Sequence, residues 1–125
     1  MAKTEESKLE QAVSAYMVRR RVWQLARYQA QSNQNGLPDR LYLYKGYLLG
    51  FELKTDNGKP TLLQEKKLEL INANGGIGLI IRRVEEIAKV LDLIDAYSSL
   101  SDNSSSLILK QYEEWKDERS DNQTK

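Results

Sequence analysis

The sequence predicts a single α/β domain in which a mixed β-sheet is flanked by helices. Residues 40–44 and 47–54 are rich in strand-forming side chains, and residues 77–81 form the short apolar run of a buried strand. Residues 5–20 and the segment after Arg83 instead repeat apolar side chains at helical spacing. A chain of 125 residues is long enough for one core but not for two.

An amphipathic helix is predicted over residues 5–20. Its apolar stripe consists of Leu9, Val13, Tyr16 and Met17. Thr4 is suited to cap its start, with acidic residues in the first turn. Glu10 lies at the edge of the stripe, where a carboxylate can face solvent or reach inward to a site. Its position alone favours solvent.

A first strand is the favoured interpretation of residues 22–30, although this segment could also extend the helix. Trp23 and Leu25 alternate with Gln24, as residues in a strand do. A polar loop ending at Gly36 follows.

A β-hairpin is predicted from residue 40 to residue 54, with Lys45-Gly46 as its turn. One face of the second strand is entirely apolar: Tyr47, Leu49, Phe51 and Leu53. The other face ends in Glu52 and Lys54. Antiparallel pairing brings Asp39, at the start of the first strand, close to these two residues.

Three helices and one strand are predicted in the second half of the chain. A helix runs from Thr61 to about Asn74, with Thr61 and Gln64 as a capping box. A buried strand over 77–81 and an amphipathic helix after Arg83 follow. A polar linker then leads to a last helix over about 107–118.

We therefore divide the chain into a domain at 1–97 and an appended part at 98–125, made of linker, helix and disordered tail. The last helix carries Ile108, Tyr112 and Trp115 on one face. It either packs back on the domain or forms a dimer contact.

Composition excludes several kinds of chemistry. The chain has no cysteine and no histidine, which rules out disulfides, thiolate nucleophiles, histidine bases and zinc held by either residue. The N-terminus has no signal-peptide pattern and no apolar run is long enough to cross a membrane. We expect a cytoplasmic protein with no membrane partner, whose catalysis would use carboxylates, lysine, hydroxyls or a metal held by oxygen.

The net charge of +1 is unevenly distributed. Residues 11–45 carry six basic residues and one acid, Asp39, whereas residues 85–105 are acidic. The asymmetry places positive potential near the predicted hairpin. Recruitment of an anionic partner and ordinary variation within a small domain both explain it.

Asp39 and Glu52 form the candidate chemical site, with Lys54 beside them. Two neighbouring carboxylates repel each other unless they share a proton or a cation lies between them. Oxygen ligands alone are the pattern of Mg²⁺ or Mn²⁺. A lysine beside such a metal can position water and neutralise a phosphate.

These residues also match a known signature. Pro38-Asp39, followed after the hairpin by Glu52-Leu53-Lys54, resembles the PD-(D/E)xK nuclease motif. The wider match consists of Glu6-Ser7-Lys8-Leu9-Glu10, Leu25-Ala26-Arg27-Tyr28, Gly36-Leu37-Pro38-Asp39-Arg40, Phe51-Glu52-Leu53-Lys54 and Leu63-Gln64. This set resembles the stand-alone, phage-type VRR-NUC (virus-type replication-repair nuclease) subgroup, from about residue 6 to residue 95.

The resemblance implies a restriction-endonuclease-like core and a role for each matched residue. It implies that Glu10 completes the acidic cluster and that Asp39 and Glu52 are the main metal ligands, with the Leu53 carbonyl as a further ligand. Lys54 would be the catalytic lysine, and Gln64 a glutamine that supports the site or contacts DNA. Gly50 would leave room for the DNA backbone.

The implied activity is Mg²⁺- or Mn²⁺-dependent endonuclease cleavage of branched DNA, such as Holliday junctions or flaps, by a homodimer. If the gene is phage-encoded, the protein would act in the bacterial host cell. Candidate contacts to the DNA backbone are the basic residues Arg19, Arg20, Arg21, Arg27, Arg40 and Lys59. For the three consecutive arginines, a solvated helix end explains the charge equally well.

Two other functions remain open at this point. A non-catalytic DNA-binding module that kept the fold would bind DNA without any dependence on metal. A plain α/β interaction domain would leave Glu10, Asp39, Glu52 and Lys54 as surface charges with no metal site.

Overall fold

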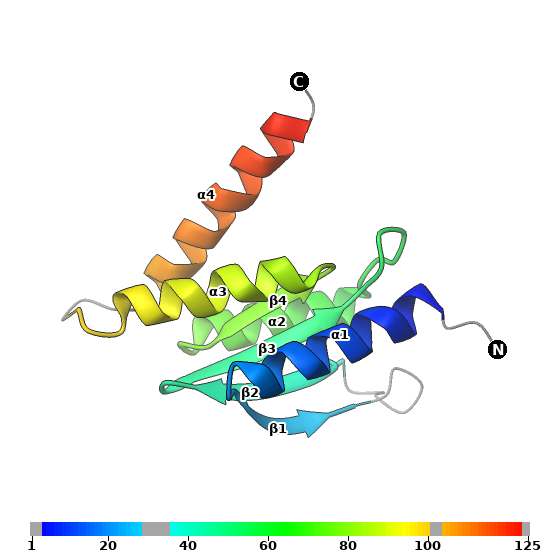
Figure 1. Ribbon diagram of the computed structural model, residues 1–125, viewed down its shortest axis with the longest axis horizontal. Helices are drawn as coiled ribbons and strands as arrows, with labels where there is room; N and C mark the ends of the chain where they lie inside the picture. The colour runs from blue at the N-terminus through cyan, green and yellow to red at the C-terminus, as the bar shows by residue number, and fades with distance from the viewer. Residues whose placement is uncertain (1–3, 29–35, 101–103, 124–125) are drawn as a thin grey trace.

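The computed structural model describes residues 4–28, 36–100 and 104–123 and confirms the α/β class (Figure 1). Within these residues, a four-stranded mixed sheet is flanked by four helices. In chain order the elements are α1 (Glu5–Arg19), β1 (Trp23–Arg27), β2 (Arg40–Tyr44), β3 (Tyr47–Leu53), α2 (Leu62–Ala73), β4 (Ile77–Ile81), α3 (Val84–Tyr97) and α4 (Ser105–Gln123). The predicted order of elements is confirmed, and the ambiguous segment after α1 is a strand.

The strands lie in the order β1-β2-β3-β4. The first two neighbouring pairs are antiparallel, and β3 pairs with β4 in parallel. The predicted two-residue turn joins β2 to β3, with φ of 49° at Lys45 and 88° at Gly46. Positive φ at both positions is the signature of the tight hairpin turn that matches the twist of the strands.

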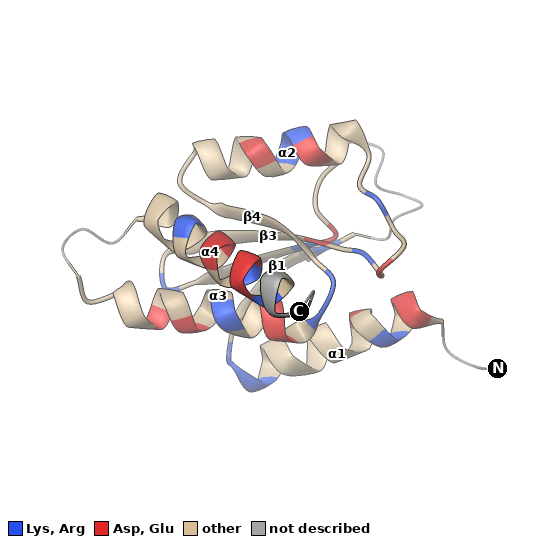
Figure 2. Cartoon of the chain, turned by 90° about the horizontal axis from the view of Figure 1, so that it is seen from above, with Lys and Arg blue, Asp and Glu red and all other residues tan. Residues whose placement is uncertain are grey.

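Helices cover both faces of the sheet (Figure 2): α2 lies on one face, and α1 and α3 lie on the other. The apolar face of β3 packs towards α1 and α3, where Leu49 and Phe51 are fully buried with Val13 of α1 and Ile94 of α3. The opposite face of β3 meets α2, which positions Glu52 beneath the start of that helix.

Gly50 lies on the α2 side of β3, and its role differs from the expected one. A Cβ on Gly50 would lie 2.6 Å from Ile71 Cδ1 and 3.1 Å from Pro38 Cγ. The glycine therefore allows close packing within the protein, and the expectation that it leaves room for DNA is wrong.

Helix α4 packs back on α3 and belongs to the same core as the rest of the chain. Ile108 and Tyr112 are both fully buried in that core. Arg119 forms an ion pair with Glu85 at 3.0 Å, so α4 returns along α3 towards its start. The helix predicted over 107–118 is longer at both ends, since α4 spans Ser105–Gln123. The residues from Ser120 to Gln123, predicted to be disordered, belong to this helix.

Membrane-spanning helices are not found among the described residues, since none of these helices is both long and apolar enough.

Candidate functional site

The open end of the β2–β3 hairpin brings together Asp39 and Glu52, as predicted. Asp39 directly precedes β2, and the last register pair of the two strands joins Arg40 to Phe51. Beyond that pair, the Asp39 carboxylate continues the ladder, because its Oδ2 accepts the N–H of Leu53 at 3.0 Å. Asp39 therefore fixes the strand end that carries the neighbouring Glu52.

Glu52 is a buried carboxyl group with one uncommitted oxygen. Its side chain is 1% exposed, and its Oε2 has no hydrogen-bond partner among the residues that the structure describes. Burial, followed by the negative charge of adjacent Asp39, raises the pKa of Glu52 to about 8. Lys54 opposes this effect, but less strongly. The pair is therefore an environment that a cation would stabilise.

Gln64 supports this carboxylate and caps α2 at the same time. Its Nε2 donates to Glu52 Oε1 at 3.1 Å, while its Oε1 accepts the Thr61 N–H at 2.9 Å. The Thr61 hydroxyl in turn accepts the Gln64 N–H at 3.1 Å, which completes the predicted capping box. The two roles considered for Gln64 are thus filled together, and the bond to Oε1 leaves Oε2 of Glu52 available.

Lys54 lies at the edge of the carboxylate pair. Its Nζ is 3.9 Å from Glu52 Oε1, and its side chain is 21% exposed. The ammonium group is thus close enough to interact with Glu52, and the side chain is exposed enough to contact a substrate.

The Leu53 carbonyl is directed towards the same region. The N–H and C=O of one strand residue point to the same side of the strand, and the Leu53 N–H points to Asp39. Leu53 also lies beyond the last pair with β2, so this backbone group is not paired with that strand.

Asp39, Glu52 and the Leu53 carbonyl fit a hard divalent cation. The uncommitted Oε2 of Glu52 and the raised pKa both indicate that the pair lacks a positive charge. Magnesium is commonly held by one or two carboxylates together with water and substrate phosphate. Across the described ranges, no three acidic side chains gather closely enough to form a complete metal cluster.

That Glu10 completes the acidic cluster stays a prediction. Helix α1 is anchored on the sheet through Val13 and Met17, both buried. Glu10 precedes Val13 by three positions and Met17 by seven, so it lies on the same side of α1 as these residues, and it is half-buried. No three-carboxylate group includes Glu10 among the residues with described positions.

Two of the predicted DNA contacts lie at the same end of the sheet as the carboxylates. Arg27 is exposed at the end of β1, and the next residue, Tyr28, donates its N–H to the Asp39 carbonyl at 2.8 Å. Lys59 is exposed in the loop after β3.

Arg40 is wrongly predicted as a DNA contact, because it is only 1% exposed. It alternates with its neighbours onto the buried face of β2, beside Tyr42. Its Nη1 donates to the Asp39 carbonyl at 3.4 Å. Arg40 thus supports the backbone of the site from inside.

The arginines at the end of α1 lie at the opposite end of the sheet. Arg20 pairs with Asp92 and Asp95, each at 3.2 Å, and Asp95 also binds Lys45 of the hairpin turn. Arg19 and Arg21, its neighbours, are exposed at this same end. Arg20 is thus paired with two carboxylates of α3, while contacts of Arg19 and Arg21 to a DNA backbone stay a prediction at this end of the sheet.

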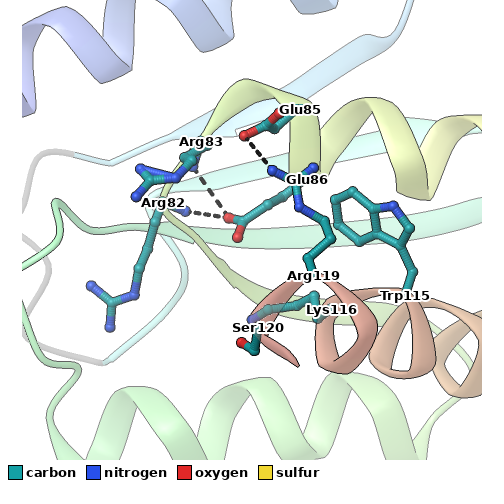
Figure 3. A pocket seen from close by; sticks show the side chains of 8 residues that line it. All are labelled: Arg82, Arg83, Glu85, Glu86, Trp115, Lys116, Arg119 and Ser120. Carbon is teal, nitrogen blue, oxygen red and sulfur yellow. Dashed lines mark hydrogen bonds and ion pairs between the residues drawn. The ribbon is translucent and has the colours of Figure 1, made fainter. Parts of the chain in front are cut away.

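Arg82 is a residue near the site that the sequence did not single out. It directly follows β4, whose last residue pairs with Leu53. Figure 3 shows it beside Arg83 at the rim of a cavity of about 160 Å³, with its guanidinium directed away from Trp115 and Arg119. Its position directly after a buried strand was the one sequence signal for Arg82. The residues that it binds lie more than twenty positions earlier, so no local pattern reveals them.

Comparison with known proteins gave no match to this chain among family models, curated proteins or solved structures.

Proposed function

We propose that this protein is a Mg²⁺- or Mn²⁺-dependent endonuclease that hydrolyses phosphodiester bonds in DNA. The observation that carries the proposal is the buried Glu52–Asp39 pair with one free carboxylate oxygen, adjacent to Lys54. Paired carboxylates and a lysine are the groups that metal-assisted phosphodiester hydrolysis needs when histidine and cysteine are absent.

In this proposal each residue has a distinct task. Asp39, Glu52 and the Leu53 carbonyl hold the cation, and Gln64 fixes the orientation of Glu52. When bound, the cation lowers the pKa of a water molecule and neutralises negative charge on the phosphate. Lys54 donates a hydrogen bond to the attacking water or to a phosphate oxygen and stabilises the charge that develops there.

The substrate would be held mainly through its phosphates. Arg27 at the end of β1 and Lys59 in the loop after β3 are both exposed, which suits contacts to a nucleic-acid backbone. Such contacts position a strand without reading its sequence. The preference for branched DNA, the homodimer and the cytoplasmic location belong to the same proposal and rest on the resemblance to VRR-NUC nucleases.

The first prediction concerns Lys54. Replacing Lys54 with Ala should lower the single-turnover cleavage rate by on the order of 10²–10³-fold, because one preorganised charge at the phosphate is lost. DNA affinity should change little. The measurement uses four-way junctions, flaps, splayed arms and linear duplex with Mg²⁺ or Mn²⁺, with binding measured separately in Ca²⁺.

Lys66→Ala is the matched control, since Lys66 is an exposed lysine of α2, outside the site. It should cleave like the wild type. Equal cleavage by Lys54→Ala, or no cleavage of any substrate by the wild type, would contradict the proposal. Salt-sensitive DNA binding without cleavage would instead favour a non-catalytic DNA-binding module.

A further inference from the structure

The turn that follows Lys54 is held from outside by Arg82. Arg82 Nη1 lies 2.5 Å from the Thr55 carbonyl oxygen and 2.8 Å from that of Gly58. A terminal guanidinium nitrogen has two hydrogens, so it can donate one to each oxygen. The turn's own hydrogen bond runs from the Gly58 N–H to the Thr55 carbonyl at 3.0 Å. Arg82 therefore ties together the two residues at which this turn begins and ends.

The same turn lies against the side chain of Lys54. A Cβ on Gly58 would be 3.4 Å from Lys54 Cδ and 3.5 Å from Lys54 Cβ, which is ordinary contact distance. The backbone of Lys54 is fixed separately, since its N–H donates to the Ile81 carbonyl at 3.0 Å. Ile81 and Arg82 are consecutive, so one short segment fixes both the backbone of Lys54 and the turn beside its stem.

Arg82 is itself held in place before any substrate binds. Its backbone N–H donates to Glu86 Oε1 at 2.7 Å, and the Arg83 N–H donates to the same oxygen at 3.2 Å (Figure 3). Its side chain is half-buried and both short contacts of Nη1 are to protein carbonyls. These features favour a role within the protein over a contact to DNA.

We propose that Arg82 is a positioning residue for Lys54, acting through the turn from Thr55 to Gly58; the inference rests on the proposed nuclease function. A lysine side chain has many accessible rotamers, and a group that acts in catalysis must be confined to few of them. Arg82 supplies that confinement by holding the turn against the stem of Lys54.

The test compares Arg82→Met, which keeps an unbranched side chain but has no donor, with Arg82→Lys and Arg83→Met. Arg83 is the matched control, because it touches the same turn only through an exposed ion pair with Asp56 at 3.1 Å. Thermal melting establishes that each variant is folded. In metal-free protein, reductive methylation of Lys54, normalised to exposed Lys66, is followed by mass spectrometry, and amide exchange of Gly58 by NMR.

In Arg82→Met, methylation of Lys54 and exchange at Gly58 should both become severalfold faster, and Arg82→Lys should give intermediate rates. Arg83→Met should match the wild type. With Mg²⁺ and a DNA substrate, kcat of Arg82→Met should fall by about 10- to 100-fold, as expected for a misplaced catalytic group, with KM close to the wild-type value.

Unchanged methylation and exchange in a folded Arg82→Met variant would overturn the inference. A raised KM with unchanged kcat would also overturn it, because Arg82 would then be a DNA contact. If Arg82→Met does not fold, Arg82→Lys takes its place. Rates of Lys54 methylation and Gly58 exchange in Arg82→Lys that equal those of the wild type would then overturn the inference. If the wild type cleaves no DNA, the proposed function fails, whereas the two metal-free measurements still decide whether Arg82 positions Lys54.

Discussion

At the scale of single residues, Glu52 is a buried carboxyl group in an unfavourable environment. Its side chain is buried beside Asp39, yet its Oε2 has no hydrogen-bond partner among the described residues. A buried polar atom without a hydrogen bond destabilises the folded state, and a neighbouring like charge adds to the cost. A cation bound here, as the proposed function requires, would make the arrangement favourable.

Glu52→Gln should therefore stabilise the metal-free protein at pH 7, by about 1–3 kcal/mol given that one pKa unit corresponds to 1.36 kcal/mol. The folded-state pKa of Glu52 is raised to about 8. The metal-free wild type consequently loses stability as pH rises from the ordinary glutamate value towards 8, and the advantage of the variant disappears below about pH 4. The measurement is urea unfolding in a chelator across this range.

Added Mg²⁺ or Mn²⁺ should stabilise the wild type but not Glu52→Gln. Glu69→Gln is the control, because Glu69 is an exposed residue of α2, outside the site. It should behave as the wild type does. A wild type that is more stable than Glu52→Gln at pH 7 in the chelator, with no response to metal, would exclude the cation site.

At the scale of elements, Asp95 joins three parts of the fold at the end opposite the site. This α3 residue accepts hydrogen bonds from the Tyr44 hydroxyl at 2.7 Å and from Lys45 Nζ at 2.6 Å. It also pairs with Arg20, which follows α1, at 3.2 Å. Asp95 thus fixes the hairpin turn and the end of α1 against α3.

Asp95→Asn should lower the free energy of unfolding by about 1 kcal/mol at pH 7, the scale of partly exposed charged hydrogen bonds. Burial alone would raise the pKa of Asp95, but the hydrogen bonds from Lys45 and Tyr44 lower it below its ordinary value. A lowered pKa gives stability that is present above the unfolded-state pKa and is lost as pH falls through the folded-state value. The difference between variant and wild type should therefore shrink below about pH 4.

Asp92→Asn provides the comparison for this prediction. Asp92 contacts the same Arg20 at 3.2 Å, but its side chain is 66% exposed. Its substitution should cost clearly less, as measured by urea unfolding at pH 7. Equal effects of the two substitutions, or no pH dependence for Asp95→Asn, would contradict the role assigned to Asp95.

Turns and helix starts that depend on neighbouring residues could be predicted from the sequence. The ends of the last helix could not be predicted as well. The Lys45-Gly46 turn and the Thr61–Gln64 capping box depend on residues adjacent in the chain, and both are confirmed. The last helix begins at Ser105 and ends at Gln123. Its ends were mispredicted because apolar spacing marks only the packed middle of a helix.

At the scale of the whole molecule, α4 completes the core and is not an appendage. The Tyr112 ring is fully buried and lies 5.7 Å from the Trp115 ring, centroid to centroid. The sequence left open whether this helix packs back or forms a dimer contact, and the structure shows that it packs back on α3.

Tyr112→Ala should lower the free energy of unfolding by about 3–5 kcal/mol, the range for removing a large aromatic side chain from a core. Tyr112→Phe should be nearly neutral or slightly stabilising, because the buried hydroxyl has no partner within the described ranges of the chain. Both values come from urea unfolding. A small effect of Tyr112→Ala would show that residues 1–97 form the core without α4.

The candidate site could be predicted in part, for physical reasons that differ between residues. Asp39 and Glu52 were placed together by strand pairing, which brings distant positions opposite each other. Glu10 shares the face of α1 that carries the buried residues Val13 and Met17, and its place in the acidic cluster stays a prediction. Arg40 was wrongly predicted as a DNA contact, because its charge suggests a surface residue whereas its position in the strand places it on a buried face. Arg82 was missed because its bonds to the turn cross between elements and leave no local pattern.

The parallel pairing of β3 with β4 also sets the order in which the molecule can mature during synthesis. The β2–β3 hairpin, with Asp39 and Glu52, is complete once the chain has grown past Leu53. The partners that fix Lys54, namely Ile81 and Arg82, emerge only after all of α2 has been made. Antiparallel neighbours can pair early, whereas a parallel partner must wait for its crossover. We therefore expect Asp39 and Glu52 to come together in the growing chain well before Lys54 is fixed in place. The candidate site is then complete only late in synthesis.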